Sequence, residues 1–308
     1  MLAADRHLSP LRSFALLPPT DSKNVDGWPP ASLTQASPRH RTRGRWEAQQ
    51  ILRLILVVVL APEASDSLEQ IQARIRAASP FGAERTEAVI RQRFRRLPQR
   101  LQVAMRHWPL GRARVLDVGC SFGHCLVHFG EGSLGIDNVP EHIEFCRALG
   151  LSAVLLDVDA GLDSVPDGVF DFAWVSDILE HVDAPRLLLR GLRPKLRADG
   201  ELLVHLSTLP SWRPARGVFR SRGLAPFDAE AHHYQFTVDT AEFLLRRAGY
   251  RIVGVVPALP ESLAMFERPA RLFVRQLPRV FVSARQDADA ERIALEAERR
   301  NKPCGQAA

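Results

Sequence analysis

The feature that most constrains this chain is residues 115–123, Val-Leu-Asp-Val-Gly-Cys-Ser-Phe-Gly. The mainly apolar start predicts a short buried strand, and the small residues after it predict a tight turn into a helix. Gly119 can adopt backbone conformations closed to other residues, and Gly123 lets helix and strand approach closely. A dinucleotide-binding turn would read G-x-G-x-x-G, but Ser121 and His124 occupy its second and third glycine positions. We therefore expect a strand–turn–helix unit that holds a ligand without phosphates.

Strands and helices alternate after residue 111. The predicted strands are residues 114–118, 134–137, 153–157, 172–176, 200–206, 251–256 and 279–284, and the predicted helices are residues 122–129, 140–149, 184–196 and 238–248. Such alternation is typical of an α/β fold with a doubly wound, mostly parallel sheet, here of seven strands. Ligands of these sheets bind at the carboxyl ends of the strands.

The regions outside this alternation differ in composition. Residues 1–65 begin with a stretch rich in Pro, Ser and Arg, and we interpret them as a disordered extension or as upstream sequence that the native protein lacks. Residues 66–110 have apolar side chains at helical spacing and predict a helical cap, which Pro98 divides into two short helices. The arginines of this cap, such as Arg100, are either a solvated basic face or a surface for an anionic partner or lipid. Residues 287–308 are a charged tail.

Charge is distributed unevenly along the chain. Residues 1–110 contain 17 Lys and Arg against 9 Asp and Glu, a balance of +8, whereas residues 111–286 have a balance of −1. A nucleic-acid substrate is disfavoured, since it usually requires a basic face around the active site. The apolar run at residues 51–61 is too short to span a bilayer, although three arginines before it also resemble a displaced signal peptide. The four cysteines lack C-x-x-C spacing, so we expect no metal site and a cytoplasmic protein with reduced thiols.

Three aspartates lie at the ends of three successive predicted strands. Asp117 precedes the glycine turn, Asp137 ends the next strand, and Asp157 ends the third. At these places carboxylates can meet a cationic amino group, the two hydroxyls of a ribose and an exocyclic amine. Each aspartate alone can also be a helix N-cap or a turn residue. Their joint placement favours a ligand with an amino acid end, a ribose and an adenine.

The same segments resemble the class I S-adenosylmethionine-dependent methyltransferases. Residues 115–123 resemble the family's first motif, with Ser121 in place of its middle glycine, and residues 135–137 resemble its ribose-binding strand. Residues 170–182, ending in Leu-Glu-His-Val, resemble the fourth-strand motif, and residues 192–204 resemble the segment before the fifth strand. The resemblance covers residues 111–285 and is strongest to the branch with ubiquinone-pathway O-methyltransferases and methyltransferases of cell-surface sugars and lipids.

This resemblance implies a Rossmann-like fold that binds S-adenosyl-L-methionine. The methionine part would lie at the glycine turn, the ribose at the second strand, the adenine at the third, and the transferred methyl group near the fourth. The residues so implied are Asp117, Gly119, Ser121, Gly123, Asp137, Asp157, Val158 and Ser176.

Methyl transfer to a hydroxyl also needs a general base, most often histidine. The candidates are His181, in the Leu-Glu-His-Val motif, and His233, which precedes a predicted helix with Thr237 as its N-cap. Each can instead have a local structural role. Residues 209–231 form a long insertion with four arginines and three aromatic residues, which either binds an anionic acceptor or is a flexible surface loop.

We therefore expect a methyltransferase of a small-molecule, lipid or sugar acceptor, with O-methylation favoured and with peripheral membrane contact compatible with the cap. An RNA or protein methyltransferase of the same fold and a non-catalytic cofactor-binding protein are the alternatives. The acceptor, the methylated atom and the oligomeric state do not follow from the sequence.

Overall fold

The computed structural model describes residues 66–211, 232–289, 292–293 and 296. All of them lie within Ala48–Ala308, the second of two compact units in the chain. The interpretations of residues 1–65, of most of the 209–231 insertion and of most of the charged tail fall outside the described residues.

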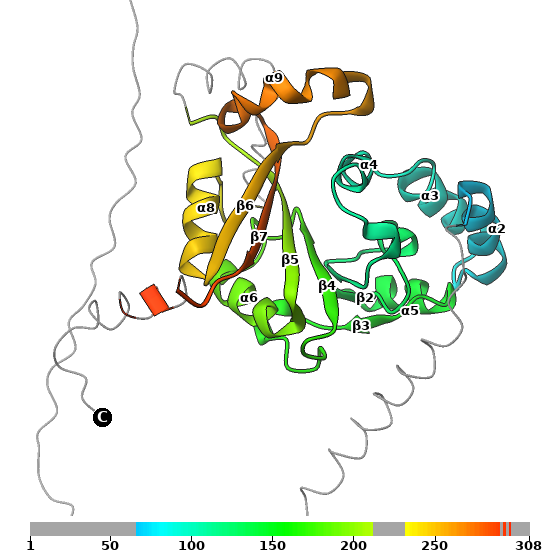
Figure 1. Cartoon of the computed structure of the whole chain (residues 1–308). Coiled ribbons are helices and arrows are strands. Elements are labelled where there is room, and N and C mark those ends of the chain that lie inside the picture. The colour runs from blue at the N-terminus through cyan, green and yellow to red at the C-terminus, as the bar shows by residue number, and fades with distance from the viewer. Residues whose placement is uncertain (1–65, 212–231, 290–291, 294–295, 297–308) are drawn as a thin grey trace, which may run out of the picture. The chain divides into compact units, whose positions relative to one another are not determined.

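A seven-stranded sheet with the order β3-β2-β1-β4-β5-β7-β6 forms the centre of the second unit (Figure 1). Its strands are β1 (Val115–Val118), β2 (Leu134–Asp137), β3 (Ala153–Leu155), β4 (Phe170–Ser176), β5 (Leu196–Ser207), β6 (Tyr250–Pro257) and β7 (Arg279–Gln286). Strands β1 to β5 pair in parallel, and β7 runs antiparallel between β5 and β6. The expected doubly wound, mostly parallel sheet is confirmed.

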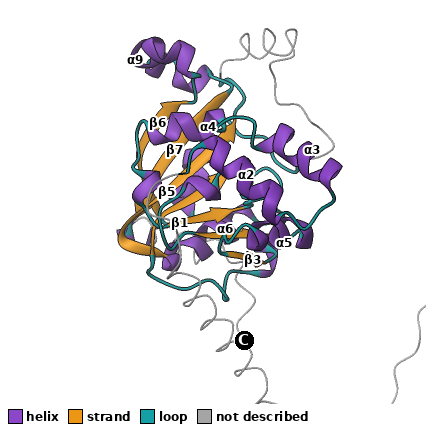
Figure 2. Cartoon of the chain, turned by 90° about the vertical axis from the view of Figure 1, so that its right-hand side faces the viewer, coloured by secondary structure: helices purple, strands orange, loops and turns teal. Residues whose placement is uncertain are grey.

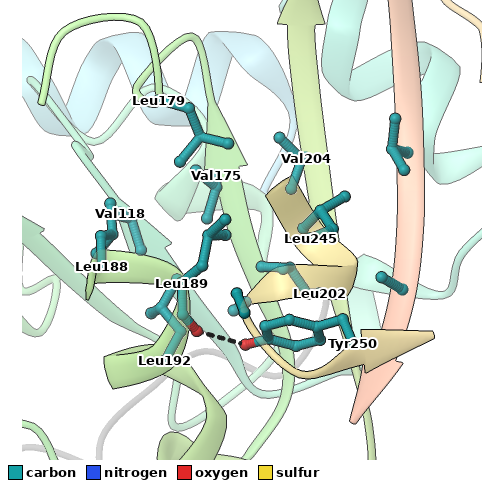
Figure 3. Packing of buried hydrophobic residues seen from close by; sticks show 14 of the residues in the cluster. Val118, Val175, Leu179, Leu188, Leu189, Leu192, Leu202, Val204, Leu245 and Tyr250 are labelled. Carbon is teal, nitrogen blue, oxygen red and sulfur yellow. Dashed lines mark hydrogen bonds between the residues drawn. The ribbon is translucent and has the colours of Figure 1, made fainter. Parts of the chain in front are cut away.

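Alternate residues of the strands build two separate apolar layers. On one face, Leu116 and Val204 belong to a large buried cluster that includes side chains of α6 (Pro185–Leu192) and α8 (Val238–Arg247). Figure 3 shows part of this cluster, in which the hydroxyl of Tyr250 donates to the backbone oxygen of Leu189 at 2.9 Å. That hydrogen bond ties β6 to α6 and satisfies the only polar atom of a fully buried ring.

The N-terminal helices cover the opposite face. Trp174 and Phe281 of the sheet pack there with Leu101 of α4 (Gln99–Met105). Helices α2 (Leu68–Ala78) and α3 (Ala83–Arg93) pack against α5 (Pro140–Ala148), and Figure 2 shows α2 and α4 in front of the strands. The expected cap is present, but it has three helices instead of two, because the chain also breaks between α2 and α3, where Gly82 caps the second helix.

The predicted helix of residues 122–129 is wrong. Only Leu126–His128 form a single 3-10 turn there. The reason is the glycine at each end: Gly123 has φ +74°, and the Cβ of any other residue at Gly130 would lie 2.6 Å from the backbone of Arg112. The conformation at Gly123 and the close approach at Gly130 restrict the backbone between them. The segment between β1 and β2 therefore forms a 3-10 turn and no α-helix.

Other elements differ from expectation mainly at their ends. Strand β3 stops at Leu155, two residues before Asp157, because Asp157 instead caps the 3-10 turn Val158–Ala160. The predicted helix of residues 184–196 ends at Leu192, since Pro194 cannot continue it. The sequence analysis did not predict the helical connection between β6 and β7. This connection is made of Glu261–Phe266, α9 (Glu267–Arg271) and Val274–Gln276. None of the helices among the described residues has the length and apolar character needed to cross a membrane.

Candidate active site

The carboxyl ends of β1, β2, β4 and β5 meet at one edge of the sheet. Asp117 lies one residue before the end of β1, Asp137 ends β2, and Ser176 ends β4. Register places Asp117 beside both Gly135 and Trp174. Three of the predicted cofactor residues are therefore brought together, as the sequence alternation required.

The turn after β1 has three residues with positive φ. Gly119 (+73°) and Gly123 (+74°) alternate with Ser121 at +49°. An ideal Cβ on Gly119 would lie 2.1 Å from Cδ1 of Ile178, and one on Gly123 would lie 2.9 Å from Sγ of Cys146. Their positive φ favours glycine at both positions, and any larger residue would also displace these side-chain atoms. Ser121 adopts a left-handed conformation that costs a non-glycine residue roughly 1–2 kcal/mol.

Asp137 holds this turn in place. Its Oδ2 accepts from the backbone N–H of Ser121 at 2.9 Å, and its Oδ1 accepts from that of Val139 at 3.0 Å. The Nδ1 of His142 lies 3.0 Å from the same Oδ1. A carboxylate has about four acceptor sites, so Asp137 keeps capacity for a further hydrogen-bond donor.

Asp117 differs from Asp137 because one of its oxygens is unpartnered. The side chain is buried, and its Oδ2 has no hydrogen-bond partner among the residues that the structure describes. Burial raises the pKa of Asp117 to about 7, with the Arg100 charge opposing and Asp137 reinforcing the shift. A buried acceptor of this kind requires a donor, preferably a cation, that the described residues do not supply.

Arg100 of the N-terminal cap reaches into this edge, which the sequence reading did not predict. Its Nη2 lies 2.7 Å from Nε2 of His124, and its Nη1 lies 3.9 Å from Oδ2 of Asp177. Burial, followed by the charge of Arg100, lowers the pKa of His124 to about 3, so His124 is neutral and accepts from Arg100 through Nε2. The interpretation of Arg100 as part of a solvated basic face is wrong: helical spacing placed it opposite the apolar stripe, but α4 itself lies against the sheet edge.

Asp177, at φ +54°, forms the other side of the same network. Its Oδ1 lies 3.1 Å from Nδ1 of His205 on β5, and its Oδ2 accepts from Ser176 Oγ at 3.3 Å. Burial opposes ionisation of Asp177, but the hydrogen bond from His205 and the charges of His205 and Arg100 outweigh it and lower its pKa to about 2. Neither His205 nor Asp177 was singled out from the sequence. The pairing of β4 with β5, which sets Ser176 beside His205, could have indicated them.

Asp157 and Val158 follow β3, the edge strand that pairs with β2. Asp157 is exposed, and its Oδ1 accepts from the backbone N–H of Asp159 at 3.1 Å. Asp157 therefore has the local capping role that the sequence also allowed, and its contact with an adenine stays a prediction together with that of Val158.

The two histidines predicted to act in catalysis lie on neighbouring segments. His233 donates its backbone N–H to the Glu180 carbonyl at 2.7 Å, and its Nδ1 lies 3.1 Å from Oδ1 of Asp183. His181 is exposed and packs edge-to-face with His232, with ring centroids 4.7 Å apart. Thr237 caps α8 as expected, accepting from the N–H of Thr240 at 3.1 Å.

The chain is similar in sequence to several known proteins. Residues 102–240 match the family model described as Methionine biosynthesis protein MetW. The ubiquinone biosynthesis O-methyltransferase of Xanthomonas euvesicatoria is 32% identical over 180 residues, which cover 53% of this chain and 73% of that protein. Its counterpart in Xanthomonas axonopodis is 34% identical over 181 residues with the same coverage of both chains.

Solved structures of similar proteins share less with the chain. An S-adenosylmethionine-dependent methyltransferase from Mesorhizobium loti is 22% identical with a TM-score of 0.43. The matched region covers 60% of this chain and 96% of that protein. A Burkholderia thailandensis 1,6-didemethyltoxoflavin-N1-methyltransferase is 21% identical with a TM-score of 0.44, and covers 74% and 93%.

The sheet order, the glycine turn and the relatives together define the class: the chain belongs to the class I S-adenosylmethionine-dependent methyltransferases. It is a methyltransferase, and S-adenosyl-L-methionine is its cofactor. The residues present fit that cofactor, since Asp117 offers an unpartnered buried acceptor to a cationic amino group and Asp137 retains acceptor capacity for hydroxyls.

Proposed function

We propose that the chain methylates a hydroxyl oxygen of a small-molecule acceptor, with His233 as the general base. The observation that carries the proposal is the pair of His233 and Asp183, in which Nδ1 lies 3.1 Å from Oδ1. The backbone of His233 is hydrogen-bonded to the carbonyl of Glu180 in the turn after β4. The similarity to proteins named ubiquinone biosynthesis O-methyltransferase supports oxygen as the methylated atom.

In this proposal the cofactor is held by residues of the first two strands. Asp117 would accept from the amino group of the methionine part, and the cofactor would lie against the main chain of the turn from Gly119 to Gly123, with Ser121 at its centre. Asp137 would accept from the ribose hydroxyls, and Asp157 with Val158 would flank the adenine. Ser176 would line the side from which the acceptor approaches. When bound, S-adenosylmethionine supplies a methyl group on a positively charged sulfur, ready for direct displacement.

Asp183 and His233 would remove the acceptor's proton. A carboxylate at Nδ1 fixes the imidazole tautomer in which Nδ1 carries the hydrogen, which leaves the Nε2 lone pair to accept the hydroxyl proton. His233 is about half exposed, with 52% of its side chain accessible, so an acceptor can reach Nε2. His181 on the adjacent turn is the other candidate base.

The acceptor is expected to be apolar or lipid-like in part. Between β6 and β7, five large apolar side chains are exposed together with three arginines: Leu263, Met265, Phe266, Leu272 and Phe273, and Arg268, Arg271 and Arg275. Such a segment suits an amphipathic acceptor or peripheral contact with a lipid surface. The proposal for the arginines of residues 209–231 as acceptor ligands stands beside it, although residues 212–231 lie outside the described part. We also place the reaction in the cytoplasm, because Cys120, Cys125 and Cys146 are free thiols.

The test is methyl transfer from labelled S-adenosylmethionine to a panel of hydroxylated aromatic and prenylated acceptors, with the methylated atom determined by NMR. His233→Ala should lower kcat roughly 10²- to 10⁴-fold while leaving cofactor affinity unchanged. Asp183→Asn should lower kcat less, since it disturbs only the tautomer of His233. A product methylated on nitrogen or carbon, or a His233→Ala variant with wild-type kcat, would refute the proposal.

A further inference from the structure

The carboxylate of Asp137 has fewer free acceptor positions than a ribose requires. Its Oδ1 accepts from the backbone N–H of Val139 at 3.0 Å and lies 3.0 Å from Nδ1 of His142. Its Oδ2 accepts from the backbone N–H of Ser121 at 2.9 Å. A carboxylate oxygen offers about two lone-pair positions, so Oδ1 is filled and Oδ2 keeps one position. The two neighbouring hydroxyls of a ribose need two positions.

The three donors to Asp137 differ in how easily they can leave it. The N–H of Ser121 belongs to the glycine turn after β1, where Ser121 itself has φ +49°. The N–H of Val139 belongs to the N-cap residue of α5. Neither of these two donors can be withdrawn unless the main chain moves. His142 is the one donor of the three that lies on a side chain, and 22% of that side chain is exposed.

The imidazole of His142 lies where it contacts both the carboxylate and the glycine turn. Because a carboxylate only accepts, Nδ1 of His142 carries the hydrogen of this contact. The ring also packs edge-to-face on Phe122 of the turn, with ring centroids 4.4 Å apart. The imidazole thus fills the acceptor position on Oδ1 with an N–H group, which is the place that a ribose O–H group would take.

We propose that His142 takes the place of one ribose hydroxyl in the cofactor-free protein and is displaced from Asp137 when S-adenosylmethionine binds. The proposal rests on the proposed binding of the ribose by Asp137 and adds a competing side chain to it. Without the cofactor, His142 keeps Oδ1 hydrogen-bonded and the carboxylate oriented. With the cofactor, Oδ1 accepts from one hydroxyl and Oδ2 from the other. His142 is therefore a positioning residue that lowers the affinity for the cofactor.

Calorimetric titration of the full chain with S-adenosylhomocysteine tests this displacement without acceptor or turnover. His142→Ala removes the competing donor and should bind about 3- to 10-fold more tightly than the parent, the range expected for one net hydrogen bond. The same variant should have a lower Tm without ligand, because Asp137 loses a donor that the folded protein supplies. A purely structural role of His142 would instead lower the affinity and the Tm together.

Two further variants of α5 serve as controls. His142→Asn is the matched variant, because Nδ2 of asparagine takes the place of the imidazole Nδ1 as a donor to the same oxygen. Its affinity should return to within about twofold of the parent value. Glu144→Ala changes an exposed residue of the same helix and should leave the affinity unchanged.

Analogues of S-adenosylhomocysteine that lack the 2′ or the 3′ hydroxyl identify the competition directly. Loss of one hydroxyl should weaken binding to the parent by at most about threefold, because His142 then keeps its place on Oδ1. The same loss should weaken binding to His142→Ala by about tenfold, since no side chain replaces the hydroxyl there.

Two results would overturn the displacement of His142. The first is an affinity of His142→Ala for S-adenosylhomocysteine that equals or falls below that of the parent. The second is an equal effect of the missing hydroxyl in parent and variant, and if that effect is zero in both, the ribose assignment of Asp137 fails as well. Since no acceptor takes part in these titrations, either result would leave the proposed O-methylation standing.

Discussion

Replacement of Asp117 by asparagine should stabilise the cofactor-free protein at neutral and alkaline pH while weakening its binding of S-adenosylmethionine. The carboxylate is buried with an unpartnered Oδ2, and burial raises its pKa from 3.8 to about 7. A group whose pKa is raised on folding binds a proton more tightly in the folded state. Its contribution to the free energy of unfolding is therefore fully present below about pH 4 and is lost as the pH rises through 7.

The size of the effect follows from the two pKa values. A shift of about 3 units corresponds to at most about 4 kcal/mol, at about 1.36 kcal/mol per unit, and roughly 2.7 kcal/mol of this falls between pH 5 and pH 8. The parent should lose that amount of stability over this range, and Asp117→Asn should not. The variant should nevertheless bind the cofactor about 10- to 150-fold more weakly, the equivalent of roughly 1.5–3 kcal/mol for a lost hydrogen bond to a charged group.

Urea denaturation at pH 5 and pH 8 measures the first effect, and calorimetric titration with S-adenosylmethionine measures the second. Since other groups also titrate in this range, the quantity compared is the difference between parent and variant at the two pH values. Glu180→Gln is a useful parallel variant, because burial also raises the pKa of Glu180 to about 7 but Glu180 has no proposed contact with the cofactor. Equal pH dependence in parent and Asp117→Asn would refute the reasoning.

Three further outcomes are expected from other residues of the site and its surroundings. Asp137→Ala should weaken binding of S-adenosylmethionine by roughly 1–3 kcal/mol. It should also lower Tm, because the N–H groups of Ser121 and Val139 lose their acceptor. Unchanged affinity in calorimetry would contradict the ribose assignment. Ser121→Gly should raise the free energy of unfolding by about 0.5–1 kcal/mol in urea, since glycine adopts a φ of +49° without strain but loses more entropy on folding. A chain that begins at residue 66 keeps the Asp66–Arg74 ion pair and the Ser67 cap of α2. It should unfold cooperatively and bind the cofactor as the full chain does. A broad, non-cooperative transition would show that the removed residues support the fold.

The sequence alone predicted the sheet and the aspartates at its edge, for a local reason. A strand followed by a glycine turn and a carboxylate at a strand end are both visible within a few residues, and parallel pairing then brings Asp117 and Asp137 together. Thr237 and its cap were predictable on the same grounds. The prediction of a helix after Gly123 was wrong because it used only the local apolar pattern. That pattern does not show that Gly130 lies against the backbone of Arg112.

Residues whose partners are distant in sequence were the ones missed. Arg100 reaches His124 from another element, and His205 meets Asp177 only because β4 and β5 are neighbours in the sheet. Helical periodicity gives the side of α4 on which Arg100 lies, but not what that side faces.

The position of β7 has a consequence for how the chain is made. The strand lies between β5 and β6, pairs with seven residues of each, and is the last of the described strands in chain order. During synthesis β5 and β6 therefore emerge before the strand that pairs with both of them, so each has an open edge until β7 follows. Unpaired edges of this kind invite pairing with other chains. A message truncated before Arg279 would thus yield a chain that contains every proposed cofactor ligand and still cannot close its sheet.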